Sequence, residues 1–139
     1  MSREEKRTWI YAVVAIVAPA VYIITMLEKV ASTPVESIDY VGAMLLAIGL
    51  AIAVSIVANI LVGMFSSAED KRKDERDVHI GRLGFILGFF TFSILMVAPL
   101  VMAVAEVPHF WIANAIYLAF ALTAFLYSAL KIVAYRRGL

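Results

Sequence analysis

YVGAMLLAIGLAIAVSIVANILVGMF, residues 40–65, contains no Asp, Glu, Lys, Arg or His. As a helix rising about 1.5 Å per residue it would extend about 39 Å, enough to cross a hydrocarbon core of about 30 Å. There are three further apolar runs: Thr8–Leu27 and Gly84–Ala105 also lack these residues, and Trp111–Ala134 contains only Lys131, in its last turn. A bilayer offers the backbone no hydrogen-bond partners, and the runs lack the alternation of barrel strands. We therefore expect four transmembrane helices, including Tyr40–Phe65.

The composition leaves little room for anything besides these helices. The chain has 139 residues, of which 63% are hydrophobic, and its mean hydropathy is +0.92. These values are far above those of a soluble domain. The first run follows a basic stretch but is too long for a signal peptide, so we expect it to be retained. The predicted fold is all-α: one four-helix domain over residues 1–139, arranged up-down-up-down in the membrane.

The basic residues predict the orientation of the helices. Ten of the 12 Lys and Arg residues lie before the first run, between the second and third, or after the fourth, and Lys131 lies on the same side, in the last turn of the fourth run. Lys29 is the exception, and it is joined in the other two connections by Glu28, Glu36, Asp39 and Glu106. Because Lys and Arg are retained on the cytoplasmic side, we expect a multi-pass protein of the cell membrane with cytoplasmic N and C termini.

Local signals mark several boundaries and one distortion. Pro19 removes a backbone hydrogen bond inside the first run, so we expect a kink or local distortion there. Ser37 is a candidate N-cap for the second helix. Ser66 and Glu69 have the spacing of a capping box, which predicts that a new helix begins after the second span.

Small residues recur at intervals of four along the second run and predict how it packs. They lie on one helix face, at Ala43, Ala47, Ala51, Ser55, Asn59 and Gly63. Such a stripe lets helix backbones approach closely in lipid, so we expect the second helix to occupy the centre of the bundle. Gly84 and Gly88 form a second helix-packing pair, with G-x-x-x-G spacing. The fourth run also has small positions, including Ala121, Ala124 and Ser128.

Two asparagines are the most polar residues of the second and fourth runs. Asn59 and Asn114 could bind an ion or a substrate, or could form hydrogen bonds between helices. Interhelical hydrogen bonds of polar side chains are common in membrane proteins. We favour that interpretation for both residues.

The connection between the second and third runs is strongly charged. Opposite charges recur at i,i+4 within residues 69–77, so we expect a charged cytoplasmic helical segment over residues 67–83 that continues into the third span. Asp74-Glu75-Arg76-Asp77, followed by Ile80 and Gly84, resembles the D-E-R-[DE]-x-x-I motif of uncharacterised small prokaryotic four-helix membrane proteins. The resemblance implies four membrane helices and carries no activity. Candidate partner-docking residues are Asp74, Glu75, Arg76, Asp77 and Ile80, although a solvated helix extension that anchors the topology is an alternative.

Function is predicted mainly by exclusion. No ionisable residue lies deep in a run, and no catalytic set, metal-ligand cluster, nucleotide-binding loop or cysteine is present. We therefore expect no enzyme activity, no cofactor and no nucleic-acid partner; an enzyme acting on lipid is the weakest alternative. The favoured hypothesis is an accessory subunit or small regulator that associates with a membrane or cytosolic protein. The main alternative is a homo-oligomeric channel or small transporter for a neutral or weakly polar solute, with a path along Ser55, Asn59, Thr91 and Ser93.

Overall fold

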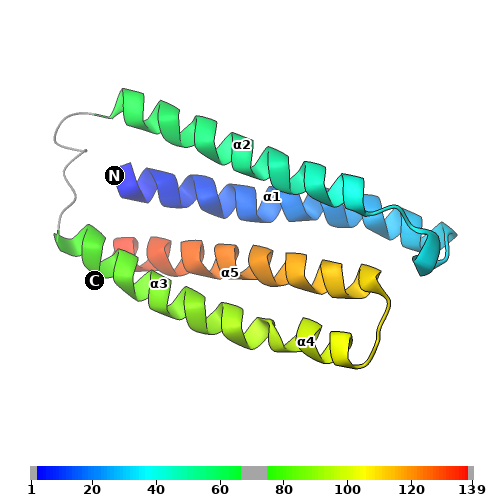
Figure 1. Cartoon of the computed structure of the whole chain (residues 1–139). Helices are drawn as coiled ribbons and strands as arrows, with labels where there is room; N and C mark the ends of the chain where they lie inside the picture. Colours follow the sequence, from blue (N-terminus) through cyan, green and yellow to red (C-terminus); the bar gives the residue numbers. More distant parts are fainter. Residues whose placement is uncertain (1–2, 67–74, 138–139) are drawn as a thin grey trace.

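The computed structural model describes residues 3–66 and 75–137, and every regular element in these ranges is helical. In chain order the elements are α1 (Arg3–Ser32), the 3-10 helix η1 (Val35–Ser37), α2 (Val41–Phe65), α3 (Glu75–Leu95), α4 (Val97–Val104) and α5 (His109–Arg137). Ser66, the candidate cap, directly follows α2. Glu69 and the helix that a capping box of Ser66 and Glu69 would begin lie outside the described ranges. Consecutive long helices run in opposite directions (Figure 1).

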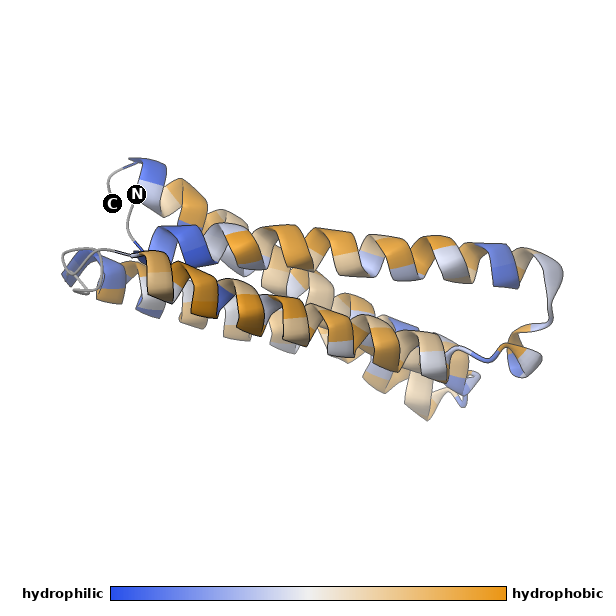
Figure 2. Cartoon of the chain, turned by 90° about the horizontal axis from the view of Figure 1, so that it is seen from above, coloured by the Kyte–Doolittle hydropathy of each residue, from blue (hydrophilic) through white to orange (hydrophobic). Residues whose placement is uncertain are grey.

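The described ranges contain four helices that are long and apolar enough to cross a membrane: α1, α2, α3 together with α4, and α5. The predicted all-helical fold with four apolar helices is therefore confirmed. Hydrophobic residues cover the middle of each helix, and hydrophilic residues gather at the two ends of the molecule (Figure 2). The helices extend beyond the apolar runs because backbone hydrogen bonding continues into the charged flanks. α1, for example, reaches from Arg3 to Ser32.

The long helices lie in the order α2, α1, α5 and then α3 with α4 (Figure 1). α1 packs against both α2 and α5, and α5 packs against α1, α3 and α4. The extensive contacts of α2 are with α1 alone, and none of its residues is buried. The expected central position of the second helix is therefore wrong. α1 and α5 form the centre and contribute most of the buried residues of the described chain, among them Tyr22 and Phe110.

The two ends of the molecule differ in charge. We call "the basic end" the end where α1 and α3 begin and where α2 and α5 finish (Figure 1).

At the opposite end, Tyr22, Met26, Ile38, Phe110 and Tyr117 form a buried cluster. It is organised by edge-to-face ring contacts, with centroids 5.0 Å apart between Tyr22 and Tyr117.

The connection between α1 and α2 closes over this aromatic cluster. Ile38 is buried in the cluster, and Tyr40 packs its ring edge-to-face against Phe110. Ser37 does not cap α2, because its hydroxyl donates to the Pro34 carbonyl and the N-cap position is occupied by Tyr40. The expectation for Ser37 is therefore wrong.

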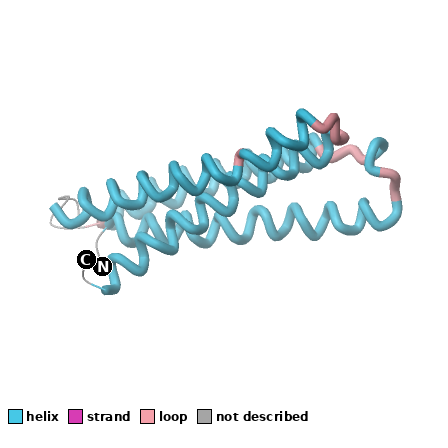
Figure 3. Tube along the Cα trace, turned by 90° about the horizontal axis from the view of Figure 1, so that it is seen from below, coloured by secondary structure: helices cyan, strands magenta, loops and turns pink. Residues whose placement is uncertain are grey.

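The two intrahelical prolines have different effects. α1 continues through Pro19 as one uninterrupted helix, so the distortion expected there does not break it. The third span is divided at Met96 into α3 and α4, and Figure 3 shows the interruption as a short loop-coloured segment. Pro99 explains this break, since it has no N–H to donate to the Leu95 carbonyl and its ring crowds that carbonyl.

Candidate functional site

A large groove lies between α1, α2 and α5 and reaches toward the basic end. Its volume is about 1060 Å³, at the upper end of the range for ligand pockets. The lining is mostly apolar and includes small residues from all three helices. α1 contributes Arg7, Tyr11, Val14, Ala15, Ala18 and Pro19; α2 contributes Ile48, Ala51, Ile52, Ser55, Ile56, Asn59, Ile60 and Gly63; α5 contributes Tyr117, Phe120, Ala121, Ala124, Tyr127 and Ser128.

The small-residue stripe of α2 divides into two parts. Ala43 and Ala47 pack against the aromatic cluster at the end opposite the basic end. The remaining four positions of the stripe line the groove: Ala51, Ser55, Asn59 and Gly63. α2 is thus held against the centre of the bundle near its beginning and borders an open groove further along. The packing role that the sequence predicts for these four positions stays a prediction.

Asn59 forms a hydrogen bond between α2 and α1 in the groove lining. Its amide donates to the Tyr11 hydroxyl at 3.1 Å and to the Ser55 carbonyl at 2.7 Å. The interhelical hydrogen bond predicted for Asn59 is confirmed. Its carbonyl oxygen Oδ1 is shielded from solvent and has no hydrogen-bond partner among the described residues.

Ser128 is a second polar group of the groove without a partner. Its side chain is 0% exposed, and its hydroxyl has no hydrogen-bond partner within residues 3–66 and 75–137. The sequence indicates only a small residue here. No sequence signal distinguishes Ser128 from the neighbouring alanines as an unpaired donor.

Asn114 joins α5 to α1 at the aromatic cluster. The Tyr22 hydroxyl donates to Asn114 Oδ1 at 2.9 Å, and the Asn114 amide donates to the Phe110 carbonyl at 2.7 Å. The interhelical interpretation of Asn114 is therefore confirmed. Because its amide and its carbonyl are both used within the protein, this residue has a structural role.

The glycine pair of α3 faces α5. A Cβ atom at Gly84 would lie 2.9 Å from Tyr127 Cε2 and 3.1 Å from Lys131 Cγ, whereas one at Gly88 would make ordinary contacts with Tyr127. Gly84 therefore allows the α3 backbone to approach the aliphatic stem of Lys131. The Lys131 side chain is buried, and its Nζ donates to the Tyr127 hydroxyl at 3.4 Å.

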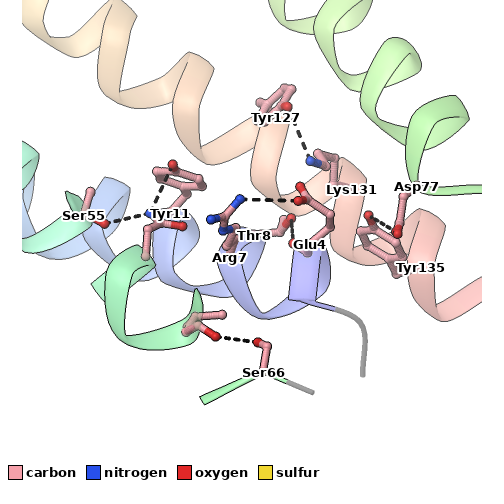
Figure 4. A network of polar contacts seen from close by, with 12 residues as sticks. Glu4, Arg7, Thr8, Tyr11, Ser55, Ser66, Asp77, Tyr127, Lys131 and Tyr135 are labelled. Carbon is pink, nitrogen blue, oxygen red and sulfur yellow. Dashed lines mark hydrogen bonds and ion pairs between the residues drawn. The ribbon is translucent and has the colours of Figure 1, made fainter. Parts of the chain in front are cut away.

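A group of contacts that we call "the α3–α5 clamp" joins the start of α3 to the end of α5. It comprises Arg76, Asp77, Ile80, Ala134 and Tyr135. The Tyr135 hydroxyl donates to Asp77 Oδ1 at 2.8 Å (Figure 4). The Arg76 guanidinium donates to the Tyr135 carbonyl, and Ile80 is buried against Ala134 and Tyr135.

The structure shows which of the candidate partner-docking residues are buried and which are exposed to solvent. Ile80 is buried and Asp77 is half-buried, whereas Glu75 and Arg76 are exposed to solvent. Glu75, Arg76 and Asp77 all take part in interactions within the chain. Asp74 lies outside the described residues, as does the part of the helical segment predicted over residues 67–83 that precedes Glu75. From Glu75 onward the charged segment is helical and continuous with the span.

The polar residues of the predicted solute path do not meet within one chain. Ser55 and Asn59 line the groove on α2, whereas Thr91 and Ser93 are on α3 and are not among the groove residues. α1 and α5 lie between the two helices (Figure 1). The Ser93 hydroxyl donates to the Phe89 carbonyl of its own helix at 2.8 Å.

Comparisons with known proteins find no matching protein family, no matching curated protein and no matching solved structure. The class of the protein therefore follows from its own helices. Its four candidate membrane-spanning helices indicate a multi-pass membrane protein.

Proposed function

We propose that this protein is a non-catalytic component of the cell membrane that acts by association, as an accessory subunit or a small regulator. In this proposal α1, α2, α3 with α4, and α5 cross the membrane in alternating directions. The basic end lies in the cytoplasm, together with both termini. The charge distribution supports this orientation, because Arg7, Arg76 and Arg136 lie near helix ends at the basic end, whereas Lys29 is at the other.

The proposal of association rests on the position of α2 at the edge of the bundle. This helix makes its extensive contacts with α1, meets the aromatic cluster only near its beginning, and has no buried residue. Leu45 and Leu46 are each 64% exposed, so much of its apolar surface is available to lipid or to another membrane helix. A helix with small and large faces, joined to its own bundle on one side, is suited to lateral association.

The start of α3 supplies the proposed contact with a partner at the cytoplasmic surface. Glu75 and Arg76 are exposed, and the clamp holds them at a defined position by joining Asp77 to Tyr135. Exposed charges at an interface rim contribute mainly to partner choice and association rate. The resemblance of residues 74–80 to a motif of small membrane proteins agrees with a shared surface of this kind.

The test is capture of the tagged protein from its own host. Cells are crosslinked, the membranes are extracted in mild detergent, and captured proteins are quantified by mass spectrometry. We expect a stoichiometric partner that is lost, by about tenfold, when Glu75→Ala and Arg76→Ala are combined, since charge complementarity at interfaces is worth about 1–2 kcal/mol or more. Arg137→Ala is the matched control, because Arg137 is also exposed at the basic end.

Other outcomes would redirect the proposal. A partner retained equally by all variants would remove the start of α3 from the interface. Recovery of the protein only with itself, as a defined oligomer, would contradict the accessory role and favour the channel or transporter. The arrangement within one chain lends that alternative less support, because Ser55 and Asn59 are separated from Thr91 and Ser93 by two helices.

A further inference from the structure

We propose that the groove between α1, α2 and α5 is a binding site for one anionic phospholipid, which enters from the leaflet at the basic end. The acyl chain lies along the apolar lining and the phosphate lies at Arg7. This inference goes beyond the proposed function and does not depend on which partner α2 or α3 contacts.

The length of the groove favours a lipid over a membrane helix. The lining residues span positions 7–19 of α1, 48–63 of α2 and 117–128 of α5, or about 16–23 Å at 1.5 Å per residue. A transmembrane helix needs about 30 Å of contact, whereas one leaflet contributes about half of that thickness. The aromatic cluster of Tyr22, Phe110 and Tyr117 closes the bundle beyond this depth.

The charge at the groove mouth favours an anionic headgroup. Arg7 lines the groove, and its Nη1 is 3.5 Å from Glu4 Oε1, while its Nε is buried without a hydrogen-bond partner in the described chain. Figure 4 shows Arg7 beside Glu4 at the start of α1, near Tyr11. A guanidinium presents further donors suited to a phosphate.

Polar groups deeper in the groove match the next part of a phospholipid. Tyr11 is one helical turn, or about 6 Å, beyond Arg7. Its hydroxyl accepts a hydrogen bond from Asn59 and so keeps its own proton to donate. Ser128 is 0% exposed, so its hydroxyl lies behind the surface of the groove. An ester carbonyl of a lipid would accept from the Tyr11 hydroxyl, whereas a purely apolar occupant would leave that donor unpaired.

The test is native mass spectrometry of the full-length protein in mild detergent. Palmitoyl-oleoyl phosphatidylglycerol and phosphatidylcholine are added in equal amounts. We expect one phosphatidylglycerol per chain, bound about 5-fold more tightly than phosphatidylcholine, as one arginine near an anionic surface provides. Ala51→Phe fills the groove and should abolish this retention. Ala53→Phe is the matched control, because Ala53 is exposed on α2 outside the groove.

A second variant tests the headgroup without changing the groove. Arg7→Gln should leave lipid bound but bring the two affinities to within about 2-fold of each other, whereas Arg137→Gln should keep the preference. Equal retention by Ala51→Phe and Ala53→Phe would overturn the proposal. So would efficient disulfide crosslinking between two chains through Ser55→Cys in this otherwise cysteine-free protein, since a second copy would then occupy the groove.

Discussion

At the residue scale, single side chains set the distances between helices. Gly84 lies against Tyr127 and Lys131 with no space for a Cβ atom, whereas nothing lies within 4 Å of a Cβ at Gly81. The sequence indicates a glycine pair at positions 84 and 88 but cannot show that only Gly84 is at the point of closest approach. The difference between the two glycines depends on the rotation of α5 about its axis, which sets how closely the Tyr127 ring approaches α3.

Gly84→Ala should therefore destabilise the α3–α5 contact. We expect a loss of about 1–3 kcal/mol, the usual cost of inserting a methyl group into a closely packed site. Thermal unfolding in detergent micelles is the measurement. Gly81→Ala is the control on the same helix and should be neutral or slightly stabilising, because alanine is a better helix former than glycine. Equal melting temperatures for the two variants would contradict the close approach.

At the element scale, the two prolines show how context decides the effect of one residue type. Both lie inside apolar runs, and both follow an alanine. The sequence predicts a lost hydrogen bond at each. The structure interrupts the helix only at Met96, before Pro99, and keeps α1 continuous through Pro19. The two helices differ in their packing, since α1 lies between α2 and α5, whereas α4 packs mainly against α5.

Pro99→Ala should join α3 and α4 into one helix. The new amide at position 99 can donate to the Leu95 carbonyl, so the turn at Met96 loses its cause. Met96 already has right-handed helical backbone angles, so the measurement is hydrogen exchange, by NMR in bicelles, of the new amide at position 99, which should be protected by its bond to the Leu95 carbonyl. Pro19→Ala should leave the backbone chemical shifts of α1 helical, as they are in the parent protein. Rapid exchange of the amide at position 99 would show that packing, and not Pro99, creates the break.

At the scale of the whole molecule, charge and apolar surface are separated along the helix axes. The described basic residues, apart from Lys29, lie at the end where α1 and α3 begin, and the long apolar segments lie between the two ends (Figure 2). This separation is what predicts the orientation in the membrane.

Reporter fusions test the orientation directly. Green fluorescent protein, which folds in the cytoplasm, should fluoresce when fused after Leu139, and alkaline phosphatase fused there should be inactive. Alkaline phosphatase inserted between Val107 and Pro108 should be active, because this connection lies at the opposite end from the basic residues. The reverse pattern would place the basic end outside the cytoplasm and would contradict the proposed topology.

The amino-acid sequence by itself determines that the chain forms four long apolar helices, because hydropathy and length are local properties that no neighbour alters. It also indicates the hydrogen-bonding role of Asn59 and Asn114, since a polar amide in an apolar span needs a partner. Only the tertiary structure decided that α1 and α5 occupy the centre and that α2 lies at the edge. It also decided that the start of α3 and the end of α5 are joined by the hydrogen bond from the Tyr135 hydroxyl to Asp77. The physical reason is that lipid and protein interiors are similarly apolar, so hydropathy cannot rank one packing above another, and the choice depends on side-chain shape across helices far apart in the sequence.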